Sequence, residues 1–347
     1  MSFGQAWKAG LGECDKPTSF AILDHFYQSG GNFVDTANNY QDEESETWLG
    51  EWMEQRRVRD QIVLATKYSS GFRGHQADEI QANFVGNNTK SLRVSVEASL
   101  RKLRTDYIDL LYIHWWDFCT SVEETMQSLN QLVAAGKVLY LGVSDTPAWL
   151  VSRANQYARD HGLRGFSVYQ GQWSAATRDF ERDVIPMCAA EGMGLCPWGS
   201  LGGGKFKSAE QREEIARSGT DPGRQNKVLS EGEEAVSAAL ERVAQRHHGA
   251  GITGVALAYV RQKTPYVVPI VGNRTLEHMK GNIEALSVVL SEEDVREVEE
   301  AYPFDVGFPM NFLFKGPIKE AHPAHSTWTN QVGHFDYVEN PKPIMFK

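Results

Sequence analysis

Short apolar runs alternate with amphipathic stretches along most of the chain, and this alternation predicts the secondary structure. The runs are rich in β-branched and aromatic residues and nearly continuous, which is typical of parallel strands covered on both faces. We expect strands at Asn32–Asp35, Ile62–Lys67, Ile108–His114, Val138–Ser144, Ser167–Trp173, Met193–Trp198 and Tyr266–Val271.

The stretches between these runs have helical periodicity. Val96, Leu100 and Leu103 fall on one face of a helix. Ser121 stands three residues before Glu124, a spacing that caps the start of another helix. Alternation of strand and helix at this spacing predicts an α/β fold with a parallel sheet.

Polar or aromatic residues of the kind found in active sites close six of the apolar runs at their carboxyl ends. They are Asp35, Lys67, His114, Ser144-Asp145, Gln170 and Trp198. A barrel gathers all such ends around one mouth, whereas an open sheet offers a crevice only at its switch point. The sequence therefore predicts a (β/α)8 TIM barrel.

Two segments interrupt the repeat. Ser200–Glu234 contains Gly202-Gly203-Gly204-Lys205 and little apolar periodicity, so a long surface loop is expected. Residues 302–347 are rich in proline and aromatic side chains, a composition too aromatic for a disordered tail. We expect residues 1–301 to form the catalytic barrel and the tail to pack over its mouth as part of the same domain.

Composition narrows the class of protein. Hydrophobic residues make up 41% and charged residues 23%, an ordinary globular balance, and the net charge of −10 argues against a nucleic-acid or anionic membrane partner. No apolar run approaches the ~18 residues of a membrane helix. Four scattered cysteines without CxxC spacing indicate reduced thiols. We expect a cytoplasmic protein with a small-molecule substrate, and its oligomeric state stays open.

Four residues form the candidate catalytic group: Asp35, Tyr40, Lys67 and His114. A lysine beside a tyrosine stabilises the phenolate and draws the phenol pKa down from ~10, which suits general acid catalysis. A carboxylate keeps the lysine charged and fixed in place, and the histidine can orient a carbonyl oxygen. Each residue alone has a plainer explanation, such as a surface ion pair or a core histidine. Their combination is much less expected by chance.

Metal chemistry is not expected. His247 and His248 lie at a polar helix end, and His322 and His325 lie in the tail, without the spacing of a ligand set. We interpret all four as solvated histidines.

The motifs around the candidate group resemble those of the aldo-keto reductase superfamily. They are Asp35-Thr-Ala-Asn-Asn-Tyr40, Ala65-Thr-Lys67, Leu111-Tyr-Ile-His114 and Gly142-Val-Ser-Asp145. Longer stretches are similar to the fungal aryl-alcohol dehydrogenase and norsolorinic acid reductase branch, namely Gly31-Asn-Phe-Val-Asp-Thr-Ala-Asn-Asn-Tyr-Gln41 and Ser45-Glu-Thr-Trp-Leu-Gly-Glu-Trp52. The resemblance runs to about Phe314. It implies that Tyr40 donates a proton, that Lys67 and Asp35 tune it, and that His114 orients the carbonyl during hydride transfer from NADPH.

The resemblance also implies cofactor contacts. Ser144, Asp145 and Gln170 match positions that bind the nicotinamide carboxamide, and Trp198 matches the aromatic ring on the nicotinamide face. The pyrophosphate loop matches Gly199, Leu201, Gly203 and Lys205, and the adenosine end of NADP+ matches Gly272, Asn273, Arg274, His278 and Asn282. Arg274 offers a planar fork to a 2′-phosphate. No GxGxxG opens a helix after a strand, so a Rossmann dehydrogenase is not supported.

The chain departs from the superfamily's pattern at three places. Asp145 stands where the superfamily commonly has asparagine, and an acid cannot donate and accept as an amide can. Gly281 replaces a frequent glutamate near the adenine. Met1–Gly4 aligns with the end of the first barrel strand, and the next landmark is already a helix at about Thr18–Ser29. The first strand is therefore expected to be truncated and the barrel less stable.

The expected substrate is an aromatic or polyketide-like aldehyde or ketone. Trp115, Trp116 and the aromatic tail offer stacking surface for a flat molecule, although core packing explains Trp115 equally well. Two alternatives stay open: a cofactor-binding regulatory subunit, as the potassium-channel β-subunits of this superfamily are, and a truncated, weakly active paralogue. The presence of all four catalytic residue types favours the enzyme. The physiological substrate and favoured direction are left open.

Overall fold

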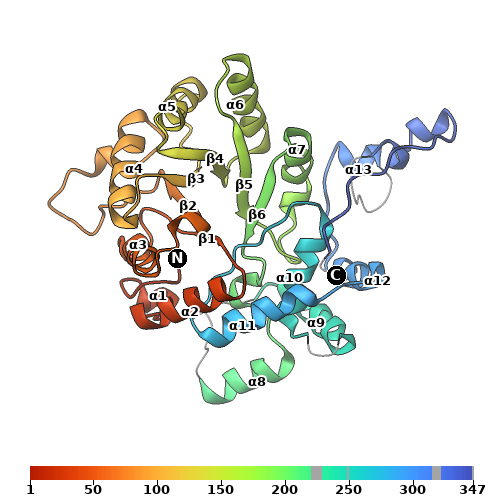
Figure 1. The fold of residues 1–347 in the computed structure, drawn as a ribbon. Helices are drawn as coiled ribbons and strands as arrows, with labels where there is room; N and C mark the ends of the chain where they lie inside the picture. The colour runs from red at the N-terminus through yellow and green to blue at the C-terminus, as the bar shows by residue number, and fades with distance from the viewer. Residues whose placement is uncertain (220–228, 248–249, 315–321, 346–347) are drawn as a thin grey trace. The chain divides into compact units, whose positions relative to one another are not determined.

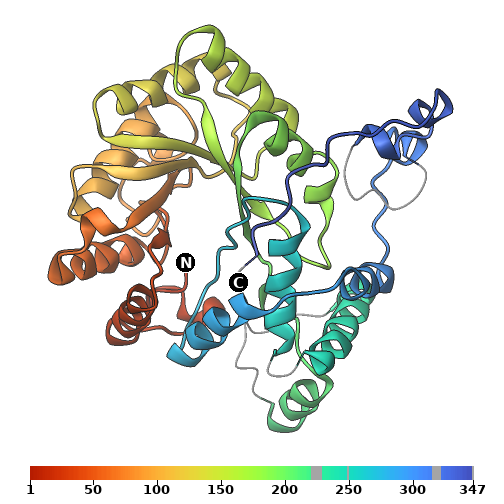
Figure 2. The same cartoon turned by 45° about the vertical axis from the view of Figure 1, so that its right-hand side comes forward.

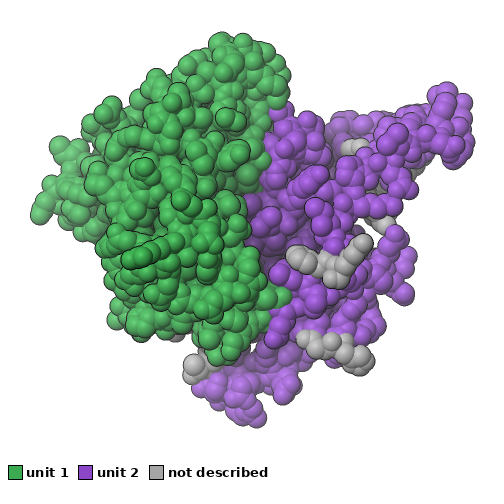
Figure 3. All heavy atoms as spheres, in the orientation of Figure 1, with its two compact units in different colours: residues 1–171, 221–226, 270–283 green, residues 172–220, 227–269, 284–347 purple. Residues whose placement is uncertain are grey.

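The computed structural model describes residues 1–219, 229–247, 250–314 and 322–345. Among these, two compact units can be distinguished (Figure 3). Unit 1 comprises Met1–Gly171 and Ile270–Ile283, and unit 2 comprises the other described residues. His248 of the predicted histidine pair lies outside the described residues.

A parallel sheet carries the candidate site. Its strands are β1 (Phe33–Asp35), β2 (Val63–Tyr68), β3 (Ile108–Ile113), β4 (Val138–Ser144), β5 (Phe166–Gln172) and β6 (Gly194–Trp198). Their order in the sheet is the order in the chain, and β1 to β5 pair in parallel. The predicted α/β class with a parallel sheet is confirmed.

The sheet has six strands within the described residues, so the predicted eight-stranded barrel is not confirmed. The strand expected at Tyr266–Val271 is wrong as a strand, since only Val267 forms an isolated bridge, to Leu195 in unit 2. Near the amino terminus, Gly4 forms an isolated antiparallel bridge with Cys14. The truncated first strand stays a prediction.

Among the described residues of unit 1, two α-helices precede β1, four connect its successive strands, and one more begins after β6. They are α1 (Lys8–Leu11), α2 (Lys16–Gln28), α3 (Glu44–Arg56), α4 (Thr89–Leu103), α5 (Val122–Ala134) and α6 (Ala148–Asp160), and α11 (Leu276–Glu284) begins in this unit. Helices α3 to α6 neighbour one another in chain order along the outer side of the strands (Figures 1 and 2). The cap predicted at Ser121 is confirmed, since its hydroxyl accepts a hydrogen bond from Glu124 N at 3.1 Å.

Apolar side chains of α2, α3, β2 and the end of α4 form the core beneath β1. Leu49, Trp52, Leu64 and Leu103 are all 2% exposed or less. The Trp52 indole satisfies its only donor on Asp24, at 2.9 Å. Burial of these large side chains holds β1 and β2 in place. The carboxyl ends of these two strands carry candidate catalytic residues.

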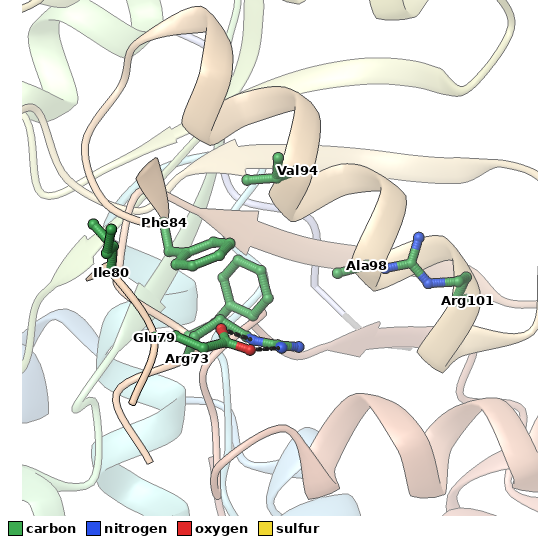
Figure 4. A pocket seen from close by; sticks show the side chains of 8 residues that line it. Arg73, Glu79, Ile80, Phe84, Val94, Ala98 and Arg101 are labelled. Atoms are coloured by element: carbon green, nitrogen blue, oxygen red, sulfur yellow. Dashed lines mark hydrogen bonds and ion pairs between the residues drawn. The ribbon is translucent and has the colours of Figure 1, made fainter. Parts of the chain in front are cut away.

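The segment between β2 and α4 is a long loop whose two ends are joined by hydrogen bonds. Gly86 N donates to Ser69 O, and Asn87 Nδ2 donates to Ser69 Oγ, both at 2.8 Å. This loop and α4 line an open pocket of about 500 Å³, where an Arg73–Glu79 ion pair lies beside the ring of Phe84 (Figure 4). No residue of the candidate catalytic group lines this pocket.

Unit 2 consists largely of helices: α7 (Val184–Glu191), α8 (Ala209–Ser218), α9 (Glu231–Arg246), α10 (Ile252–Lys263), α12 (Glu292–Ala301) and α13 (Met310–Leu313). Helix α9 packs against α10 and α12. Helix α8 corrects the prediction of a long surface loop over Ser200–Glu234, and Ser208 starts it with a capping box that closes on Gln211. In the tail, the rings of Phe312 and Trp328 lie 5.6 Å apart. Its packing over a barrel mouth stays a prediction.

Candidate active site

Asp35 and Lys67 form a buried ion pair at the ends of β1 and β2. Their side chains are 7% and 0% exposed. The Lys67 ammonium contacts Asp35 Oδ1 and also donates to Thr36 O at 2.7 Å. Adjacent parallel strands place the two side chains together, because Asp35 is in register with Ala65, two residues before Lys67.

Tyr40 follows β1 in a turn and lies against this pair. Its ring centroid is 5.2 Å from Lys67 Nζ, and its hydroxyl is 3.4 Å from His114 Nε2. His114 follows β3 directly. The structure thus brings together the four residues that the sequence singled out, through contacts within unit 1.

The electrostatics of Tyr40 differ from the sequence prediction. Burial raises the pKa of the phenol, Lys67 lowers it and Asp35 raises it, and the balance lies above the ordinary value. The predicted lowering of this pKa is therefore wrong for the site as it stands, because burial outweighs the lysine. Tyr40 is consequently a protonated phenol across the physiological pH range.

Lys67 and His114 hold opposite charge states. Burial lowers the pKa of Lys67, but Asp35 and Tyr40 together raise it further, so the ammonium stays charged. Burial and the positive charge of Lys67 lower the pKa of His114 to about 3. The imidazole is therefore neutral near pH 7, with one ring nitrogen as donor and the other as acceptor.

The residues predicted to bind the carboxamide continue from this group. Gln170 Nε2 donates to Asp35 Oδ2 at 2.9 Å, so its amide is linked to the ion pair. Asp145 N donates to Gln170 O at 3.0 Å, and Asp145 has a left-handed φ of +44°. Ser144 is buried, and its hydroxyl lies 3.3 Å from Asp145 Oδ2. An exposed carboxylate thus stands where the superfamily commonly has an amide.

The predicted adenosine-end segment also lies in unit 1. Buried Asn273 accepts a hydrogen bond from Asn282 Nδ2 at 2.7 Å, which links the segment to α11. Arg274 donates from Nη1 to Leu11 O at 3.4 Å. Its guanidinium passes so close to Gly12 that a β-carbon there would lie 2.0 Å from Nη1. Arg274 therefore contacts the amino-terminal segment through Nη1, and its other N–H donors can bind a ligand.

His278 and Gly272, also in this segment, make other contacts. His278 lies in the first turn of α11, and its backbone N–H bonds to Thr275 Oγ1 at 3.2 Å. A β-carbon on Gly272 would lie 2.7 Å from Ser2 Oγ, so the amino-terminal segment also approaches the backbone here. The roles predicted for Gly272, Asn273, Arg274, His278 and Asn282 stay predictions.

The remaining predicted cofactor residues lie in unit 2. Trp198 ends β6 with 37% of its surface exposed. After it, Gly199 and Gly203 have left-handed φ angles of +75° and +61°, which glycine adopts without steric cost. Leu201 precedes the short helical turn Gly202–Gly204. Lys205 is held by Glu233 of α9, with Nζ–O distances of 2.6 and 2.7 Å, so its charge is already paired in this structure.

The two tryptophans predicted to bind substrate differ in exposure. Trp116 is 5% exposed and belongs to the core, so it offers little surface. Trp115 is half-buried, and its indole N–H donates to Ser70 Oγ at 3.1 Å. Their substrate-binding roles stay predictions.

Several residues that contact the site carry no signal in the sequence. Trp7 lies edge-on to Tyr40, with ring centroids 6.3 Å apart, and its indole donates to Asp42 Oδ1 at 2.9 Å. Its backbone N–H bonds to Gln41 Oε1 at 2.7 Å. Gln41, Asp42 and Glu43 all have left-handed φ angles, of +55°, +49° and +78°. The turn that presents Tyr40 is therefore strained, and the amino-terminal segment supports it.

Comparison with known proteins identifies the family. The sequence profile described as "Aldo/keto reductase family" matches residues 1–303. Norsolorinic acid reductase B of Dothistroma septosporum is 59% identical, over 99% of this chain and 88% of the relative. Aryl-alcohol dehydrogenase GME11368 of Pestalotiopsis microspora is 51% identical over the same shares of the two chains. The putative aryl-alcohol dehydrogenase AAD14 of Saccharomyces cerevisiae is 50% identical over 91% of this chain and 85% of its own.

The chain therefore belongs to the aldo/keto reductase family of oxidoreductases. The family that its motifs predicted is confirmed. Among the described residues, no helix has the length and apolar character needed to cross a membrane. No group of three or more histidine, cysteine or acidic side chains within the described ranges could hold a metal ion. His247, expected to be solvated, instead lies 2.9 Å from Asp294 Oδ2.

Proposed function

We propose that the protein is an NADPH-dependent reductase that interconverts an aldehyde or ketone and its alcohol, with Tyr40 as the proton donor. The observation that carries this proposal is the buried ion pair of Lys67 and Asp35, with Tyr40 against it and a neutral His114 beside Tyr40. A phenol, an ammonium and a carboxylate in this order serve acid catalysis at a carbonyl oxygen.

The residues divide the chemistry among themselves. When bound, the nicotinamide supplies a hydride to the carbonyl carbon. Tyr40 transfers its hydroxyl proton to the carbonyl oxygen, so that the alcohol leaves with one hydride and one proton added. Lys67 stabilises the resulting phenolate, because its ammonium lies 5.2 Å from the ring centroid and cannot reach water. Asp35 fixes Lys67 in place, and Gln170 fixes Asp35.

The donor set of the chain fits a dinucleotide phosphate. Arg274 presents guanidinium donors next to a glycine whose missing side chain makes room for them. Left-handed glycines such as Gly203 allow the backbone to approach a pyrophosphate closely. We assign NADPH rather than NADH on the basis of Arg274, since a guanidinium fork binds a phosphate with charge-assisted hydrogen bonds.

The substrate class follows from the relatives. Norsolorinic acid reductases and aryl-alcohol dehydrogenases align over most of this chain at 50–59% identity. We therefore assign an aromatic or polyketide-like carbonyl compound or the corresponding aryl alcohol as substrate, within secondary metabolism. A cytoplasmic location stays a prediction.

A panel of aromatic aldehydes and ketones with NADPH tests the proposal. Oxidation of NADPH, followed at its absorbance maximum, is expected for at least one compound. Tyr40→Phe should lower turnover by about 10²-fold or more and leave NADPH fluorescence quenching near wild type, because acid catalysis typically contributes 10²–10⁴-fold. Tyr27→Phe is the matched control, since it removes a hydroxyl that donates to Gln61 Oε1 at 2.7 Å, away from the site.

Each result separates the proposal from its alternatives. Tight NADPH binding with no turnover across the panel would indicate a regulatory subunit instead. Weak binding and weak turnover together would indicate a degenerate paralogue. Normal turnover by Tyr40→Phe would remove Tyr40 from the mechanism.

A further inference from the structure

A short chain of hydrogen bonds leads to the side of His114 that faces away from Tyr40. Trp115 Nε1 lies 3.1 Å from Ser70 Oγ, and Ser70 Oγ lies 3.2 Å from His114 Nδ1. On the other side of the imidazole, Nε2 lies 3.4 Å from the Tyr40 hydroxyl. Ser70 comes three residues after Lys67 and has no part in the mechanism described above.

The chemistry of the three side chains fixes the direction of the first bond and favours one direction for the second. An indole N–H can only donate, so the Ser70 oxygen accepts from Trp115. The single hydroxyl hydrogen of Ser70 then needs an acceptor. Among the described contacts of Ser70 Oγ, His114 Nδ1 is the only one that can accept. With Ser70 as the donor, His114 Nδ1 has no hydrogen, and in a neutral imidazole the hydrogen is then on Nε2.

Asn87 holds Trp115 and the residue that precedes Ser70. Asn87 Nδ2 donates to Trp115 O at 3.0 Å and to Ser69 Oγ at 2.8 Å. The carbonyl of Ser70 accepts from Asn38 Nδ2 at 3.1 Å. Because Ser69 is held in a left-handed conformation with φ +98°, Ser70 has little freedom to turn away from the imidazole.

We propose that Ser70 is a positioning residue, locked by the Trp115 indole, that holds His114 in the Nε2–H tautomer so that this hydrogen points to the substrate's carbonyl oxygen. The inference rests on the proposed reductase function. Two donors, Tyr40 O–H and His114 Nε2–H, then converge on one oxygen, which is the arrangement that stabilises negative charge developing there.

Nitrogen NMR on the full chain with ¹⁵N-labelled histidine tests the tautomer directly, and His114→Gln assigns the signal. The wild-type protein is expected to show an unprotonated Nδ1 and a protonated Nε2. In Ser70→Ala the Nδ1 shift should move toward a mixture of tautomers, and Trp115→Phe should produce a smaller change of the same sign. Ser70→Thr, which keeps the hydroxyl, should restore the wild-type spectrum.

Kinetics with the best panel substrate supply the second measurement. Ser70→Ala should lower kcat by about 10-fold, the loss expected when one hydrogen bond no longer fixes the reacting group, with NADPH affinity unchanged. Ser128→Ala is the matched control: it removes a buried serine hydroxyl that bonds Thr89 Oγ1 at 2.6 Å, away from the site.

The outcomes decide the proposal whether or not the reductase function holds. A wild-type spectrum with Nδ1 protonated would overturn it, and so would an unchanged spectrum and kcat in Ser70→Ala. If no panel compound is reduced, the proposed function fails, yet the spectra of wild type and Ser70→Ala still show whether Ser70 sets the tautomer. A shifted spectrum with unchanged kcat would also refute the positioning role.

Discussion

Replacing Asp35 by asparagine should destabilise the protein, because it leaves the buried Lys67 ammonium without its counter-charge. Lys67 is 0% exposed and cannot turn to water. Of its partners, Thr36 O at 2.7 Å and the ring of Tyr40 remain, and the Tyr112 ring at 5.6 Å remains as well. These are dipoles and quadrupoles, which compensate an ammonium only in part.

The expected cost follows from the behaviour of broken buried pairs. Removing one partner of such a pair typically costs about 3–5 kcal/mol. The contacts left on Lys67 place Asp35→Asn near the lower end of that range. Natural domains unfold at a cost of only about 5–15 kcal/mol, and for a chain of 347 residues such a loss should lower the melting temperature by roughly 4–5 °C.

The contribution of Lys67 to the pH dependence of the free energy of unfolding should also change sign. In the wild type the pKa of Lys67 is raised in the folded state, so its contribution is complete below the unfolded pKa and is lost only as pH rises through the folded value. Without Asp35, burial lowers the folded pKa below the unfolded one. The unfolded state then binds more protons, and the stability of Asp35→Asn should rise between pH 6 and pH 9.

Thermal unfolding at pH 6, 7.5 and 9 measures both effects. The double variant Asp35→Asn/Lys67→Met is the control, since removing both charges should recover much of the lost stability. Equal melting temperatures for wild type and Asp35→Asn, or a double variant no more stable than the single one, would refute the reasoning.

Three further predictions concern cofactor, pH and unit 2. Arg274→Ala should weaken NADPH binding far more than NADH binding in fluorescence titrations, and equal weakening would show that Arg274 does not bind the 2′-phosphate. Since the pKa of His114 lies at about 3, kcat/KM should show no inflection from this residue between pH 5 and 8. An inflection in that range that vanishes in His114→Gln would contradict the neutral imidazole. Asp294→Ala should cost about 1–2 kcal/mol at pH 7, because Asp294 closes the capping box of α12 and accepts from Arg246 at 2.8 Å. Burial opposes the charged form of Asp294, but these bonds outweigh it and lower the pKa of the carboxyl. In urea unfolding, the extra stability of the wild type over Asp294→Ala should therefore be complete above the unfolded-state pKa and shrink as pH falls through the folded-state pKa.

Periodicity predicted the parallel sheet because its signal is local. Six of the expected strands form, and Asp35 and Lys67 lie where the ends of the first two place them. The run at 266–271 looks the same in sequence but forms only the bridge at Val267, since a strand also needs partners along its length. Helix α8 was missed because its face is mostly polar, and its capping box at Ser208 was the one available signal.

The candidate site shows a sharper limit. The identities of Asp35, Tyr40, Lys67 and His114 could be chosen from the sequence, because acid, phenol, ammonium and imidazole at strand ends are a distinctive combination. The direction of the Tyr40 pKa could not, since it depends on how much burial opposes Lys67. The role of Ser70 could not be predicted either, because only the folded loop after β2 brings its hydroxyl to His114.

The strained turn beside Tyr40 links two distant parts of the chain. Three consecutive left-handed residues, Gln41 to Glu43, cost about 1–2 kcal/mol each relative to right-handed backbone. The amino-terminal segment offsets that cost through Trp7, and the same segment receives Arg274 at Leu11 O. A ligand that draws Arg274 away from Leu11 thus acts on the support of the proton donor as well. By linkage, if a ligand at Arg274 changes the affinity of a ligand that contacts Tyr40, the second ligand changes the affinity at Arg274 by the same factor.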